Sequence, residues 1–198
     1  MPTSSPFFAY LSRLRWIRRW GLMRNAIEEN VATHSWEVAT LAHALALLRN
    51  RRFGGTVNAD RVAAAALYHD ATEVITGDLP TPVKYHSRVM REAFGDIEHK
   101  AEDELLALLP EALRPAFEPY LRESGLSEEE RTLIKAADRL SAWLKCRAEL
   151  TAGNPEFAPA EAQIRRRLEQ EDLPEVRYFF EVFAGSYDQP LDHLLKPD

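Results

Sequence analysis

Residues 62–70 read Val62-Ala63-Ala64-Ala65-Ala66-Leu67-Tyr68-His69-Asp70, an alanine-rich apolar run that ends in two polar side chains. The run predicts a helix that holds both His69 and Asp70. Because an unpaired buried carboxylate is costly, Asp70 in such a stretch needs a partner. Imidazole nitrogens and carboxylate oxygens together suit a divalent transition ion such as Mn, Fe, Co, Ni or Zn, and a bound ion would supply that partner.

Two more residues of the same chemistry lie far from this pair in the sequence. His34 is at the start of one predicted helix, and Asp138 is in the middle of another. Adjacent residues are about 100° apart around a helix, so His69 and Asp70 can bind one ion together only near a helix end or along oblique directions. Gly77 and the prolines after it favour a nearby helix end. All four residues are therefore candidate ligands of one metal ion.

Simpler explanations exist for parts of this set. A His-Asp dipeptide often arises by chance, and Asp138 could form a surface salt bridge with Lys135 or Arg139, which contributes little to stability. The addition of His34 and Asp138 to the pair favours a metal site over chance.

Glu73 is the next candidate. It follows His69 by four residues and Asp70 by three, so all three share a helix face if the helix continues. A carboxylate beside a metal but not bound to it has the position of a general base that acts on metal-bound water. The alternative is a residue that orients His34 or His69 through a hydrogen bond.

Composition limits the function classes. The chain has 198 residues, of which 45% are hydrophobic and 28% charged, as expected for a single globular domain over residues 1–198. No apolar run approaches the roughly 20 residues that a bilayer crossing needs, and the N-terminus lacks the features of a secretory signal. The single Cys146 cannot form an internal disulfide, which suggests the reducing cytosol. A net charge of −6 argues against nucleic-acid polymers but permits a small phosphorylated substrate.

Apolar residues recur at helical spacing through most of the chain and predict an all-α fold. The expected helices cover residues 6–19, about 34–49, the alanine-rich run after Asn58, about 87–108, about 127–150, 159–171 and 174–184. We expect a core over about residues 7–150 with additional C-terminal helices over about 159–184.

Caps and prolines set the expected boundaries. Asn30 or Thr33 can cap the second helix, Asn58 the third, and residues 127–130 form a capping box before the long late helix. Residues 77–82 must be a loop, because two closely spaced prolines cannot continue a helix. Residues 111–122 are expected to form a short segment broken by Pro115 and Pro119.

Seven stretches carry a likeness to a known family. They are residues 7–14, 19–20, 22–25, 29–35, 68–74, 76–85 and 135–138. Together they resemble the bacterial HD-domain 5′-deoxynucleotidases of the YfbR type, within the HD-domain metal-dependent phosphohydrolase superfamily. The likeness runs from about residue 7 to 150. Its most specific part is residues 77–84 combined with Arg19-Trp20, since the H…HD…D pattern alone fits several HD enzymes.

The resemblance implies one divalent ion, Co, Mn or a similar transition metal, held by His34, His69, Asp70 and Asp138. It implies hydrolysis of deoxyribonucleoside 5′-monophosphates to a deoxynucleoside and phosphate, through attack by metal-associated water with Glu73 as the catalytic glutamate. It further implies a cytoplasmic homodimer that binds neither a nucleic-acid polymer nor a membrane.

The resemblance also implies that Trp20 acts with Glu73 in catalysis by orienting the phosphate. The implied substrate contacts are Arg19, Trp20, His34, Asp70, Asp78, Leu79, Pro80, Thr81 and Asp138. A guanidinium fork suits phosphate, and Asp78 on a proline-stiffened loop suits a sugar hydroxyl. On the residues alone, Trp20 fits the core equally well, and Asp78 fits a turn residue that bonds local backbone.

Two other functions stay open at this point. One is a different HD-type nucleotide phosphohydrolase, either a triphosphohydrolase or a phosphodiesterase. The other is a non-catalytic helical module stapled by its metal, which would need neither Glu73 nor Arg19.

Overall fold

The computed structural model of the chain describes residues 4–84 and 86–195, and within these ranges its regular structure is helical, which confirms the all-α fold. The α-helices are α1 (Phe7–Leu11), α2 (Val31–Arg52), α3 (Ala59–Leu67), α4 (Glu73–Thr76), α5 (Thr81–Lys84), α6 (Arg88–Leu108), α7 (Arg114–Leu121), α8 (Glu128–Thr151), α9 (Ala158–Gln170), α10 (Pro174–Val182) and α11 (Leu191–Leu194). The short 3₁₀-helices are η1 (Ser12–Trp16), η2 (Glu111–Leu113), η3 (Glu123–Gly125), η4 (Pro155–Phe157) and η5 (Ala184–Asp188). None of the helices in the described ranges has the length and hydropathy that a membrane crossing requires.

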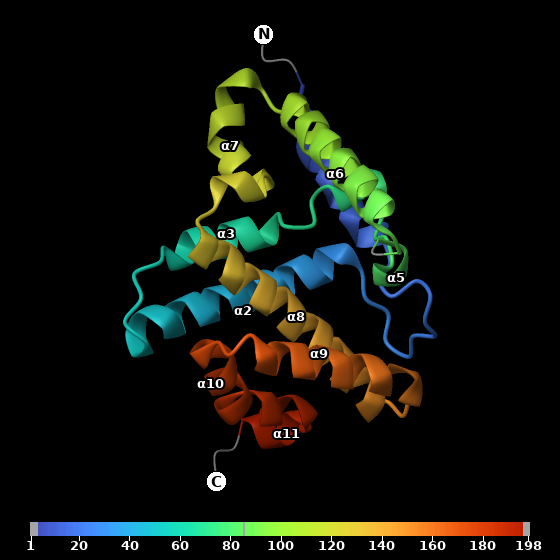
Figure 1. Ribbon diagram of the computed structural model, residues 1–198, viewed down its shortest axis with the longest axis vertical. Coiled ribbons are helices and arrows are strands. Elements are labelled where there is room, and N and C mark those ends of the chain that lie inside the picture. The colour runs from blue at the N-terminus through green and yellow to red at the C-terminus, as the bar shows by residue number, and fades with distance from the viewer. Residues whose placement is uncertain (1–3, 85, 196–198) are drawn as a thin grey trace.

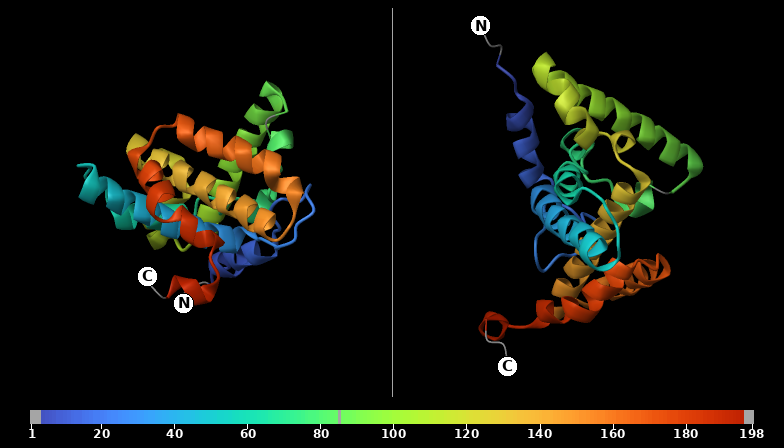
Figure 2. Two further views of the ribbon diagram at one scale, coloured as in Figure 1. Left: turned by 90° about the horizontal axis from the view of Figure 1, so that it is seen from below. Right: turned by 90° about the vertical axis from the view of Figure 1, so that its left-hand side faces the viewer.

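Helices α2, α3 and α8 form the centre of the molecule, with α6 and α7 toward one end and α9–α11 toward the other (Figure 1). The right-hand view of Figure 2 shows the same separation of the green helix α6 from the orange and red helices α9–α11. The buried side chains of Leu45, Val62 and Leu140 belong to one apolar cluster that joins the three central helices. Small alanines on α3, such as Ala66, let α2 approach closely. The candidate ligands come from the ends and middle of these central elements.

Local capping signals account for the starts of the three central helices. The Asn30 side chain accepts a hydrogen bond from the Thr33 N–H, and Thr33 bonds back to the Asn30 N–H, so the two expected caps of α2 act together. Asn58 caps α3. The capping box over residues 127–130 opens α8. These predictions are confirmed.

Four expected boundaries were wrong. The first predicted helix turns into η1 after Leu11, and the alanine-rich helix ends at Leu67 rather than continuing through Asp70. Helix α5 begins inside the expected loop, because its proline lies in the first turn, where no N–H partner is needed. Pro119 lies within α7 without ending it, at the loss of one helical hydrogen bond.

Residues 17–30 form an irregular loop that is closed at its base by backbone pairing. Arg18 and Asn30 form an isolated antiparallel bridge, and the Val31 N–H donates to the Ile17 carbonyl over 3.0 Å. The buried carboxylate of Glu149 on α8 accepts hydrogen bonds from the N–H groups of Ala26 and Ile27, at 2.8 and 3.0 Å. The base of the loop is thus closed at the start of α2, and its tip is attached to α8.

Removing the Glu149 carboxylate should destabilise the protein. Lys145 and Asn154 also donate to it, and these hydrogen bonds hold the pKa of the fully buried Glu149 at about 2, against the effect of burial. Glu149→Ala leaves the Lys145 ammonium buried without this partner, so we expect a loss of about 3–5 kcal/mol in the free energy of unfolding, measured by urea denaturation. Glu169→Ala, which breaks an exposed pair with Arg165, is the control and should change stability by less than about 1 kcal/mol. Equal effects of the two variants would contradict the anchoring role.

Candidate metal centre

His34 lies in the first turn of α2, and its side chain is almost completely buried. Its Nε2 atom is 3.1 Å from Oδ1 of Asp138 on α8 and 3.6 Å from Oδ2 of Asp70. The capping box at Asn30 fixes where α2 begins and therefore where this imidazole points. A residue from early in the chain thus meets one from the long late helix.

His69 and Asp70 occupy the turn that follows α3. The Nε2 atom of His69 is 3.1 Å from Oδ2 of Asp70, and the rings of His34 and His69 are 5.3 Å apart. One ligand atom each from His34, His69 and Asp70 lie within 4.8 Å of one another. Because the helix ends at Leu67, His69 and Asp70 are not held about 100° apart as adjacent helical residues would be, and both side chains can point toward His34.

The alternatives for Asp138 do not hold. Lys135 pairs with Glu123 at 3.2 Å and Arg139 with Glu171 at 2.5 Å, so the two neighbours proposed as its surface partners are engaged elsewhere. Asp138 instead contacts His34. The structure therefore clusters His34, His69 and Asp70, and places Asp138 in contact with His34.

Hydrogen bonds orient both imidazole rings with Nε2 inward. Nδ1 of His69 lies 2.8 Å from the Ala66 carbonyl oxygen, to which it can only donate. Nδ1 of His34 is 3.0 Å from the Ser141 hydroxyl, which in turn donates to Glu37 over 2.5 Å. Each ring therefore carries its proton on Nδ1 and offers Nε2 as a ligand atom when neutral.

Sequence reasoning missed Ser141 and Glu37. Ser141 follows Asp138 by three residues on α8, and Glu37 follows His34 by three on α2, so each lies one turn beyond a candidate ligand. That spacing was the available signal. It would have placed both residues on the ligand-bearing faces of their helices.

The side chains present fit a divalent transition ion. Among the described residues, the buried Nε2 atoms of His34 and His69 lack a hydrogen-bond partner of good geometry. Two such nitrogens facing two carboxylates form a mixed N/O donor set, which suits zinc, manganese, cobalt and similar ions. Unpaired buried polar atoms are rare in proteins, and an ion at this position would satisfy both.

Electrostatics keeps both candidate carboxylates ionised. Burial raises the pKa of Asp70, but the nearby positive charge of His69 outweighs this effect and holds the pKa well below its usual range. Burial also raises the pKa of Asp138, and the close contact with His34 outweighs that effect and lowers it. Both carboxylates are therefore available as anionic ligands at neutral pH.

Metal binding should tighten as pH rises. In the metal-free protein burial lowers the pKa of His69, but the Asp70 charge raises it more, to about 9, so His69 is an imidazolium at neutral pH. A metal must displace this proton, so apparent affinity should increase about tenfold per pH unit for each proton released, between about pH 6.5 and 8.5. Titration calorimetry of Zn²⁺ into chelator-stripped protein, in buffers of different ionisation enthalpy, measures the released protons. Binding without proton release would contradict this charge state.

Glu73 is the first residue of α4, so it lies close to the cluster without the continuous helix that was expected. Burial, Asp70 and Asp78 raise its pKa to about 9. Its Oε2 atom is buried and has no hydrogen-bond partner among the described residues. The alternative role, orienting His34 or His69, is not supported, because their Nδ1 atoms bond Ser141 and Ala66.

Arg19 lies in the irregular loop and faces the acidic cluster. Burial lowers the pKa of its guanidinium, but the charges of Glu29, Asp70, Asp138 and Asp78 raise it more. Its Nη1 donates to Oε1 of Glu29 over 2.6 Å. The side chain is thus a nearly buried cation beside the candidate metal site.

Trp20 has a left-handed backbone conformation, with φ of 59°, which is uncommon for a bulky residue. Its ring is 5.3 Å from the Phe157 ring, and its buried Nε1 has no partner among the described residues. The backbone N–H of Trp20 hydrogen-bonds the Asp78 side chain. Burial raises the pKa of Asp78. The backbone partner of Asp78 is thus remote in sequence, unlike the local turn bond that was the alternative. Of the other predicted loop residues, Leu79 and Pro80 are half-buried and Thr81 is exposed.

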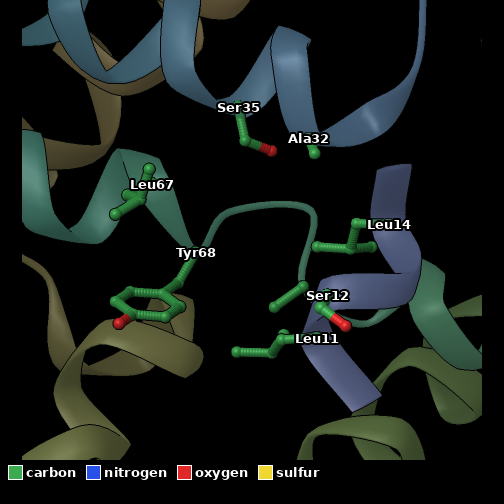
Figure 3. Close-up of a pocket in the computed structure, with 8 residues that line it drawn as sticks. Leu11, Ser12, Leu14, Ala32, Ser35, Leu67 and Tyr68 are labelled. Atoms are coloured by element: carbon green, nitrogen blue, oxygen red, sulfur yellow. The ribbon is translucent and has the colours of Figure 1, made fainter. Parts of the chain in front are cut away.

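An apolar cavity of about 220 Å³ lies beside the first turns of α2 (Figure 3). Leu14, Leu67 and Tyr68 line it, and the buried Ser35 hydroxyl points into it without a partner among the described residues. None of its lining residues is a predicted site residue. The sequence prediction therefore did not include this cavity.

Comparison with known sequences gives full-length matches. The sequence model of the family described as 5′-deoxynucleotidase YfbR-like matches residues 6–187. The proteins named 5′-deoxynucleotidase YfbR from Shigella boydii and Escherichia coli are each 50% identical to this chain over 190 residues, covering 96% of it and 96% of the relative.

Solved structures share the fold. An HD-domain phosphohydrolase from Listeria innocua matches with a TM-score of 0.79 and 25% identity, covering 91% of this chain and 87% of its own. The HD phosphohydrolase of cyanophage S-2L, solved with dA and one catalytic Zn²⁺ ion, matches with a TM-score of 0.64 and 21% identity, covering 91% and 96%. The overall helical fold of this chain is that of HD-domain phosphohydrolases.

Proposed function

The chain belongs to the YfbR-like 5′-deoxynucleotidase family, and from this premise we infer that it is a hydrolase that removes the 5′-phosphate from deoxyribonucleoside monophosphates. The observation that carries the conclusion is the 50% identity to named 5′-deoxynucleotidases over 96% of both chains. The reaction is hydrolysis of a phosphoric monoester to a deoxynucleoside and phosphate.

We propose that His34, His69, Asp70 and Asp138 hold one divalent ion. The two unpartnered Nε2 atoms and the two ionised carboxylates support this assignment. A divalent ion held there supplies electrophilic polarisation of the phosphate and positive charge against the acidic side chains. Co²⁺, Mn²⁺ or a similar transition ion suits this mixed donor set.

Glu73 is our candidate for the base that accepts a proton from the attacking water. Its buried Oε2 has no partner among the described residues, so a lone pair is available. The same burial and the charges of Asp70 and Asp78 raise its pKa to about 9 in the metal-free protein. A divalent ion bound to Asp70 would offset its charge, and the pKa of Glu73 would then fall toward the working pH, as a general base requires.

Arg19 and Trp20 are our candidates for binding and orienting the phosphate. A planar guanidinium offers several donors to phosphate oxygens, and Arg19 already faces the cluster. Trp20 is the next residue in the same loop, where its backbone is strained and its buried indole N–H has no partner among the described residues. Strain of this kind is common at functional sites.

The nucleoside is proposed to lie against residues 78–81, with Asp78 accepting a hydrogen bond from a sugar hydroxyl. Asp78 is connected to the Trp20 backbone, so the phosphate and sugar subsites share one hydrogen-bonded support. His34, Asp70 and Asp138 would also contact the substrate, since they surround the reacting phosphate.

We further propose that the protein is a cytoplasmic homodimer. The proposal rests on membership of the family. Size-exclusion chromatography with light scattering tests the oligomeric state, and a monomer at micromolar concentration would contradict the dimer.

The reaction is tested by phosphate release from a substrate panel. The panel contains deoxyribo- and ribonucleoside mono- and triphosphates, each assayed with Mn²⁺, Co²⁺, Zn²⁺, Mg²⁺ or chelator. We expect release confined to deoxyribonucleoside monophosphates and abolished by chelator. Pyrophosphate or triphosphate as a product would assign the chain to another HD phosphohydrolase reaction. Metal binding without any hydrolysis would indicate a non-catalytic module.

A further inference from the structure

We propose that Glu29 is a positioning residue that holds the Arg19 guanidinium in place for the substrate phosphate. This inference rests on the proposed phosphate-binding role of Arg19. It concerns a residue outside the predicted site, which neither the ligand set nor the spacing of the motifs indicates.

The two residues are joined through both backbone and side chain. The Arg19 N–H donates to the Glu29 carbonyl over 3.0 Å, at the closed base of the irregular loop. Arg19 Nη1 donates to Glu29 Oε1 over 2.6 Å, and the two side chains are only 14% and 13% exposed. Charge-assisted hydrogen bonds in such sheltered surroundings are strong and directional.

The adjacent pair provides an internal comparison. Arg18 and Glu28, which precede Arg19 and Glu29 in the two paired segments of the loop, form an ion pair of 3.0 Å, but their side chains are 74% and 72% exposed. Alternation along the extended backbone turns one pair toward solvent and the other toward the cluster. Exposed ion pairs such as Arg18–Glu28 contribute little to stability or positioning, whereas the sheltered Arg19–Glu29 pair can hold its side chains in place.

Glu29 counters the attraction of Arg19 to the candidate ligands. Asp70 and Asp138 are close enough to raise the pKa of Arg19, yet among the described residues the ion pair of Arg19 is with Glu29. An unheld guanidinium would turn toward these carboxylates and away from the phosphate position. A single Nη1 contact leaves the other donors of the fork for phosphate oxygens.

The sign of the effect separates positioning from simple electrostatics. Removal of a negative charge near an anion site should tighten phosphate binding if Glu29 acts only through its charge. Loss of the guanidinium position should weaken it, since small misplacements of a binding group have large effects. The two models therefore predict changes in opposite directions.

The experiment measures product inhibition by inorganic phosphate in the metal-loaded protein, with KM and kcat for a deoxyribonucleoside monophosphate. We expect Glu29→Ala to raise the inhibition constant and KM by about tenfold or more. Glu29→Gln keeps an acceptor oxygen of the same reach and should recover part of the loss. Glu28→Gln is the matched control and should stay within about twofold of wild type.

Metal content is measured in every variant, because Glu29 Oε1 is also 3.6 Å from Nδ1 of His34. The metal content should remain at the wild-type value, which excludes an effect of Glu29 through His34. In the Arg19→Ala background, Glu29→Gln should have no further effect on phosphate inhibition, since it acts through Arg19.

Two results would overturn the inference: unchanged or tighter phosphate inhibition in Glu29→Ala, or additive effects in the double variant. A different result tests the proposed function itself. If Arg19→Ala alone leaves phosphate inhibition unchanged, Arg19 is not the phosphate ligand, whatever Glu29 does.

Discussion

Glu73→Gln should lower kcat by about 10²–10⁴-fold while the protein retains its metal. The amide has the size of the carboxyl group but cannot accept a proton from water. The Oε2 atom of Glu73 has no partner among the described side chains, so the change should leave the binding of metal and substrate largely intact. Steady-state kinetics and metal analysis of the same preparation measure both effects.

Glu92→Gln is a suitable control, because Glu92 is an exposed residue of α6 paired with Arg88. Its kcat should equal that of the wild type. If Glu73→Gln kept near-normal turnover, Glu73 would be removed as the base. If it lost metal, Glu73 would belong to the ligand set instead.

Asp138→Ala should lose the metal and, with it, activity. The change removes one anionic ligand and leaves Nε2 of His34 without its nearest carboxylate, which is 3.1 Å away. Outer partners of metal ligands alone account for about 10–100-fold in affinity, so loss of a ligand should exceed about 100-fold. Equilibrium dialysis against Mn²⁺ or Zn²⁺ gives the affinity directly.

Asp96→Ala provides the comparison, because Asp96 is an exposed aspartate on α6. It should bind metal as the wild type does. Unchanged metal content in Asp138→Ala would show that the ligand assignment is wrong. Recovery of activity at high metal concentration would instead show weakened binding, which agrees with the assignment.

The fold could be predicted largely because its signals are local. The Asn30–Thr33 cap and the capping box at 127–130 involve residues three apart, so the sequence alone indicates where α2 and α8 begin. The end of α3 could not be found in this way. His69 and Asp70 leave the helix although the apolar run before them favours its continuation, and only their convergence on His34 explains the turn.

The candidate ligands were also recognisable, since imidazole and carboxylate side chains in apolar helices have few other uses. Their proximity could not be predicted from the sequence. Asp138 could equally have formed a surface salt bridge, and this alternative is removed only by the tertiary structure, in which Lys135 and Arg139 pair with Glu123 and Glu171. Those partners are 12 and 32 residues away, as the residue numbers show.

The sequence by itself determined the helical class, the main helix starts and the chemical identity of the candidate metal ligands, because each depends on short-range spacing or on side-chain type. The tertiary structure alone decided which atoms face the candidate metal position and what holds them. Ser141 meets His34 across 107 residues, and the Arg19–Glu29 pair depends on a loop closed by backbone pairing. Such contacts form when elements distant in the sequence pack together, and no local pattern encodes them.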